Sequence, residues 1–62
     1  MRREYEEALE KVGVRVLDVY RFKDKDIIRF LYKGKVYVVD LKRYYDSMKP
    51  DDLVNAVLSH TA

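Results

Sequence analysis

The chain has 62 residues, no cysteine and one histidine, and its 13 lysines and arginines nearly balance 11 aspartates and glutamates. Without cysteine it can form neither disulfides nor thiolate metal sites, and one histidine cannot build an imidazole-rich metal centre. We expect one domain over residues 1–62, near the lower size limit for folding without a disulfide, a metal or a partner subunit.

Positive charge gathers in the middle of the chain. Residues 21–43 carry eight positive and three negative side chains, whereas residues 1–12 carry three and four, and residues 44–62 carry one and three. No apolar run reaches the roughly 20 residues that span a bilayer, and the charged first residues lack a signal-peptide core. We therefore expect a cytoplasmic protein without membrane contact. Abundant Lys, Glu, Tyr and Val with no Gln fit a thermophilic source.

The first segment predicts a helix over residues 2–12, ended by Gly13 at a position where helix C-caps favour glycine. Glutamates occupy its first turn, where the helix dipole favours negative charge. Its apolar residues recur at the spacing of a buried helical stripe: Tyr5, Ala8, Leu9 and Val12.

From Val14 onward the apolar period changes to two, which predicts strands at about 14–23, 26–33 and 35–41. Lys33-Gly34 is typical of a tight hairpin turn, and the stretch KDKD marks a weaker one. A short helical turn is expected between Leu41 and Met48. Pro50 and two aspartates then open a last helix, whose buried stripe is Leu53, Val54, Val57 and Leu58.

The expected fold is α+β, in the order helix, three-stranded antiparallel meander, helix (α-β-β-β-α), with the helices on one face of the sheet. This order resembles the double-stranded-RNA-binding fold, which small toxin nucleases of the HicA type also adopt. The chain has no Lys-rich start to its last helix and no histidine in the sheet. The resemblance therefore implies an arrangement of elements and no function.

Strand pairing predicts which residues share a face. A two-residue turn at Lys33-Gly34 sets Phe30 against Tyr37, and the first hairpin is expected to set Val19 against Phe30, which keeps like charges from facing one another. The helix-covered face would then be Leu17, Val19, Ile28, Phe30, Tyr32, Tyr37, Val39 and Leu41. The opposite face would be Val16, Asp18, Tyr20, Phe22, Ile27, Arg29, Leu31, Val36, Val38 and Asp40.

This opposite face is mostly apolar, although a solvated sheet face normally alternates with polar residues. Three interpretations stay open: β-branched residues that are simply exposed, a surface for a second copy or another protein, or an aromatic platform for single-stranded nucleic acid. The third strand could also pair with another chain at its edge. The candidate partner-binding residues are Tyr20, Phe22, Ile27, Arg29, Leu31, Val36 and Val38.

Meander geometry brings the first turn and the end of the third strand to one edge of the sheet. A basic end is expected there, able to contact a few phosphates or simply solvated, because Asp24, Asp26 and Asp40 dilute it. Its candidate nucleic-acid-binding residues are Arg21, Lys23, Lys25, Lys42 and Arg43.

Catalysis has little support in the sequence. Ser59 and His60 are neighbours on a helix and point in different directions. Asp24 and Asp26 lack the glycine and distal glutamate of a calcium loop, and Asp51-Asp52 is typical of a helix first turn. We expect no enzyme, cofactor, metal or small-molecule substrate.

The sequence therefore leaves the function open between two kinds of binding. The leading hypothesis is a small interaction module that forms a homodimer or binds a protein partner through the open sheet face or the edge of the third strand. The alternative is a nucleic-acid-binding protein that uses the basic end and the aromatic and arginine side chains of that face.

Overall fold

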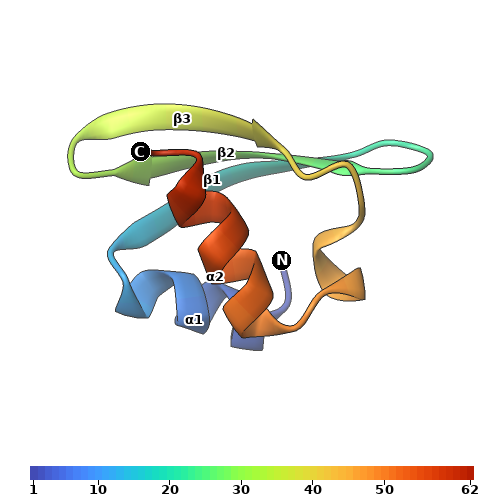
Figure 1. Cartoon of the computed structure of the whole chain (residues 1–62), viewed down its shortest axis with the longest axis horizontal. Coiled ribbons are helices and arrows are strands. Elements are labelled where there is room, and N and C mark those ends of the chain that lie inside the picture. The colour runs from blue at the N-terminus through green and yellow to red at the C-terminus, as the bar shows by residue number, and fades with distance from the viewer.

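The structure is a computed structural model that describes all residues from Met1 to Ala62. Its elements are α1 (Arg3–Lys11), β1 (Val14–Arg21), β2 (Asp26–Tyr32), β3 (Lys35–Asp40), the 3₁₀ turn η1 (Tyr45–Ser47) and α2 (Pro50–Ser59). The strands form one antiparallel sheet in the order β1-β2-β3. Figure 1 shows both helices on the same side of this sheet. The α+β class and the α-β-β-β-α order are confirmed.

Each helix begins and ends where its local sequence favours. Glu4 and Glu6 lie in the first turn of α1, and Gly13 follows its end with a φ of 84°, a conformation that glycine adopts without strain. Pro50 is the first residue of α2, where its missing N–H leaves no bond unmade. Neither helix is long and apolar enough to cross a membrane.

The core lies between the sheet and the two helices. Leu9 of α1 and Leu53 of α2 are fully buried, as are Ile28 and Phe30 of β2. These side chains belong to one cluster, which also contains Tyr5, Val14, Val39, Tyr45 and Val57. Apolar stripes of both helices and alternate residues of the sheet therefore meet in a single core.

The β2–β3 hairpin has the expected register. Phe30 pairs with Tyr37, and Tyr32 with Lys35. Lys33 and Gly34 form the two-residue turn with φ values of 51° and 79°, as a turn with two positive φ angles requires.

The β1–β2 hairpin differs from the expected register. Val19 pairs with Ile28 and not with Phe30, because the backbone N–H of Phe22 donates to the carbonyl of Lys25 at 2.8 Å and places the turn at Lys23 and Asp24. A β-bulge between Val16 and Asp18 shifts the pairing again. The expected register of the first hairpin was wrong, although the face assigned to the residues after the bulge is unchanged.

The bulge brings Val16 to the core face of the sheet and takes Leu17 out of the core. Val16 packs against the core, whereas it was expected on the opposite face. Leu17 was expected in the core, but it has no cross-strand partner at the bulge and is 36% exposed. Unbroken alternation would have kept Val14 out of the core; with the bulge, Val14 is 1% exposed.

Candidate functional site

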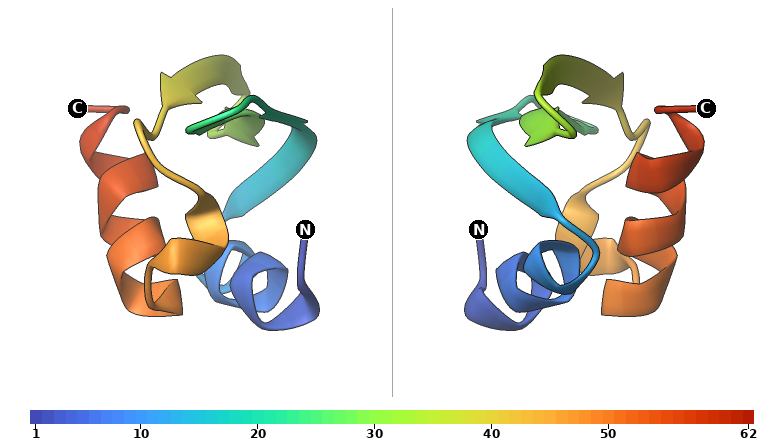
Figure 2. Two further views of the ribbon diagram at one scale, coloured as in Figure 1. Left: turned by 90° about the vertical axis from the view of Figure 1, so that its right-hand side faces the viewer. Right: turned by 90° about the vertical axis from the view of Figure 1, so that its left-hand side faces the viewer.

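The sheet face that bears no helix is the largest candidate site. Both views in Figure 2 show α1 and α2 on the other side of the sheet. Side chains of all three strands point to this open face. We define it by the residues Arg15, Asp18, Tyr20, Phe22, Lys25, Ile27, Arg29, Leu31, Val36, Val38 and Asp40.

Apolar side chains of the open face reach solvent on both outer strands. Tyr20 and Phe22 at the β1 side are 49% and 50% exposed, and Val36 and Val38 on β3 are each 54% exposed. Ile27 and Leu31, on the central strand, are half-buried. The structure thus places all the apolar candidates for partner binding on one helix-free surface.

The charges of the open face are largely paired within it. The Nε of Arg29 donates to Asp18 Oδ2 at 2.7 Å across β1 and β2, and this hydrogen bond raises the pKa of Arg29. Lys25 Nζ lies 2.9 Å from Asp40 Oδ2. That contact raises the pKa of Lys25 and, together with the backbone N–H of Lys42, lowers the pKa of Asp40. Only Arg15 adds an unpaired charge to the face.

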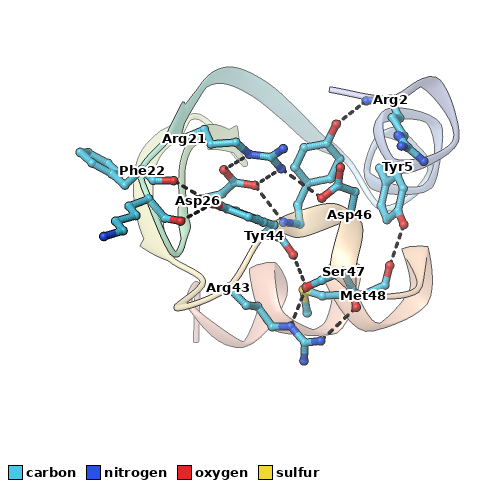
Figure 3. A network of polar contacts seen from close by, with 12 residues as sticks. Arg2, Tyr5, Arg21, Phe22, Asp26, Arg43, Tyr44, Asp46, Ser47 and Met48 are labelled. Atoms are coloured by element: carbon cyan, nitrogen blue, oxygen red, sulfur yellow. Dashed lines mark hydrogen bonds and ion pairs between the residues drawn. The ribbon is translucent and has the colours of Figure 1, made fainter.

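The basic end forms where it was expected. The Asp26 N–H donates to the Arg43 carbonyl at 3.0 Å, and the Tyr44 hydroxyl donates to the Phe22 carbonyl at 3.2 Å. These bonds join the β1–β2 turn to the chain that follows β3 (Figure 3). The five basic candidates therefore lie at one end of the sheet.

Arg21 is engaged by two carboxylates of this end, although its side chain is 46% exposed. Its Nε and Nη2 donate to the two carboxylate oxygens of Asp26 at 2.9 and 2.8 Å, and Nη2 also donates to Asp46 at 3.1 Å. Its guanidinium carbon lies 4.2 Å from the Tyr44 ring centroid. Figure 3 shows the guanidinium turned toward these groups.

Asp26 is the centre of a polar network that the sequence analysis did not recognise as structural. Its side chain is fully buried, and Oδ2 accepts a third bond from the Tyr45 backbone N–H at 2.9 Å. Hydrogen bonding from Arg21 outweighs burial and lowers the pKa of Asp26. One signal was present: Asp26 alternates with Ile28 and Phe30, so it shares their buried face.

Apart from Lys25, which pairs with Asp40, the other basic candidates have no carboxylate partner. Lys23 and Lys42 make no ion pair, and Arg43 donates to the side-chain and backbone oxygens of Ser47, both at 2.9 Å. Four carboxylates nevertheless stand among the five basic groups of this end: Asp24, Asp26, Asp40 and Asp46.

Two of the polar residues considered for catalysis, Ser59 and His60, lie at the end of α2. The Ser59 hydroxyl donates to the Ala56 carbonyl at 2.9 Å, one turn back in α2, and His60 is exposed. A groove of about 420 Å³ lies between α1 and α2, lined by Glu4, Glu7, Asp51, Lys11 and three apolar residues. No group of three or more His, Cys, Asp or Glu side chains is placed to hold a metal ion.

Comparisons with known proteins add no relative. No family model, no curated protein and no solved structure matches this chain.

Proposed function

We propose that this chain is a small, non-enzymatic interaction module that self-associates, most simply as a homodimer, through the open sheet face or the edge of β3. One observation carries the proposal. Tyr20, Phe22, Val36 and Val38 are each about half exposed on one surface, where all charged side chains except that of Arg15 are paired with one another. Contiguous apolar surface of this kind marks interfaces in small soluble proteins.

The charge pattern favours a second copy over nucleic acid. Arg29 and Lys25 are compensated by Asp18 and Asp40, so the face offers little net attraction to phosphates. A surface that carries both signs can instead meet itself in a two-fold contact. The aliphatic side chains of Val36 and Val38 gain from burial and cannot stack on bases.

Val38→Lys tests the proposal by placing a charge at one of the two apolar positions of β3 that are each 54% exposed. We expect the wild-type chain to show a mass above that of a monomer at high concentration by light scattering, and the variant to remain monomeric. Asn55→Lys, an exposed site on α2, adds the same charge away from the sheet and serves as the control. A wild-type chain that is monomeric throughout would remove the proposal.

A second candidate, nucleic-acid binding, has one observation in its favour. Lys23, Lys42 and Arg43 have no carboxylate partner at the end of the sheet where Phe22 is half exposed. This candidate predicts a gel shift with a mixed DNA or RNA oligonucleotide that weakens steeply with salt and is reduced by neutralising these three residues. No shift at low salt would exclude it.

A further inference from the structure

We propose that self-association occurs through the free edge of β3. Two copies would pair antiparallel about a two-fold axis, with Val38 facing Val38 of the second copy and the two three-stranded sheets joined into one. This inference rests on the proposed function and deepens it, because it names the contact that a second copy makes.

The hydrogen-bonding pattern of β3 leaves unpaired backbone N–H and C=O groups along its outer edge. The Leu41 N–H donates to the Asp26 carbonyl at 3.1 Å, so Leu41, Val39 and Tyr37 direct their backbone groups toward β2. Alternation then turns the N–H and C=O groups of Val36 and Val38 away from the sheet. No backbone bond outside the sheet ladder engages either residue.

The two edges of the sheet differ in protection. β1 carries the bulge between Val16 and Asp18, a device that twists an edge away from foreign strands. β3 pairs with β2 without interruption, contains no proline, and has no charged residue between Lys35 and Asp40. β3 is therefore the edge that accepts a further strand.

The antiparallel register follows from the positions that face outward. Pairing Val38 with its own copy sets Val36 against Asp40 and engages every outward group of the strand, in about six backbone hydrogen bonds. A shift by two residues in either direction would bring Gly34 or Lys42 into the pairing, and their φ values of 79° and 61° are not those of an extended strand. In the preferred register Tyr37 faces Val39, a favourable aromatic and β-branched pair, and no like charges are opposed.

The contact is small. A strand of six residues spans about 20 Å, so the interface falls at the low end of the sizes that sustain stable dimers. We expect association to depend on concentration in the range from about 10 μM to about 1 mM.

Val38→Pro isolates the backbone contribution, because proline removes an N–H that points to solvent in the monomer and is tolerated at sheet edges. We expect it to raise the dimer dissociation constant by about tenfold or more while the circular dichroism spectrum stays that of the wild type. Leu31→Lys, on the central strand, is the matched face variant, and we expect it to leave the dimer intact. If the dimer persists in Val38→Pro and is lost in Leu31→Lys, pairing through the β3 edge is refuted, whereas self-association itself is not.

Single cysteines give a second measurement that does not depend on proline, because the chain has no native cysteine. Facing residues of a hydrogen-bonded antiparallel pair lie about 5.5 Å apart, within disulfide range, so Val38→Cys is expected to crosslink under mild oxidation. Arg29 lies directly across from Val38 on β2, and the two Arg29 positions would be about 14 Å apart. Crosslinking of Arg29→Cys without Val38→Cys would indicate face-to-face packing and refute the edge contact, whereas a monomeric wild type would remove the proposed function as well.

Discussion

Asp26 shows how one buried carboxylate sets the geometry of an entire end of this molecule. It faces Arg21 directly across β1 and β2. The neighbouring Phe22–Lys25 pair is hydrogen-bonded, so Arg21 and Asp26 form a non-hydrogen-bonded pair, the type in which side chains lie closer together. It also anchors the Tyr45 N–H, which starts η1. Strand β2, the first hairpin and the segment before α2 therefore meet at a single side chain.

Asp26→Asn keeps the size of the side chain and removes its charge. We expect a loss of about 1–3 kcal/mol in the free energy of unfolding at pH 7, because the charge-assisted bonds from Arg21 are weakened and an amide N–H₂ is buried among donors. Urea denaturation measures it. Asp24→Asn, in the exposed turn, is the control and is expected to change stability by less than about 0.5 kcal/mol. Equal losses in the two variants would show that the network is not structural.

Stability is also expected to depend on acid pH. The pKa of Asp26 is lower in the folded chain than its ordinary value, so the carboxylate stabilises the fold above about pH 4. That contribution is lost as the pH falls through the folded-state pKa. Asp40, whose pKa is also lowered, acts in the same direction. Denaturation between about pH 5 and pH 2 is expected to show a shallower pH dependence in Asp26→Asn than in the wild type, and parallel curves would contradict this assignment.

Lys33 occupies a backbone conformation that lysine adopts with strain. Its φ is 51° in the β2–β3 turn, where asparagine before glycine is preferred. Lys33→Asn is therefore expected to raise the free energy of unfolding by about 0.5–1 kcal/mol. Lys35→Asn, inside β3, places a poor strand former in the sheet and is expected to lower it. Calorimetry of both variants checks the sign of each change.

At the scale of elements, the two hairpins differ in how far the sequence determines them. The β2–β3 register was predicted because Lys33-Gly34 admits one short turn and every later residue then alternates. The β1–β2 register was not predicted correctly, since the turn sequence KDKD accepts loops of several lengths and no local signal marks the bulge at Leu17. Burial of Val14 and the Arg21–Asp26–Tyr45 contacts select the observed pairing, and these depend on residues far along the chain.

Paired alanine substitutions test the bulge directly. Val14→Ala is expected to lower the free energy of unfolding by about 1.5–3 kcal/mol, because Val14 is buried against the helices. Leu17→Ala is expected to lower it by less than about 1 kcal/mol, although leucine is the larger residue, because Leu17 projects to solvent at the bulge. Thermal unfolding ranks the two variants. A larger loss of unfolding free energy for Leu17→Ala than for Val14→Ala would contradict the bulge and support the unbroken alternation expected from the sequence.

At the scale of the whole molecule, this chain has two helices and a sheet with two apolar faces, and the helices cover one of them (Figure 2). The composition of the open face was predictable from alternation alone for every residue after the bulge. The state of its charges was not, since Arg29 and Asp18 become partners only once the strands are in register. Contact of this face or the β3 edge with a second copy depends on how two chains fit together, and local sequence patterns do not determine that fit.

Mass in solution tests the central claim most directly. Light scattering over about 10 μM to about 1 mM, at low and high salt, is expected to show the mass rising from the 7.5 kDa of one chain toward twice that value. An apolar and main-chain contact predicts that salt changes this rise little, and that an added oligonucleotide leaves it unchanged. A constant 7.5 kDa at every concentration, or an increase only when oligonucleotide is present, would contradict the account.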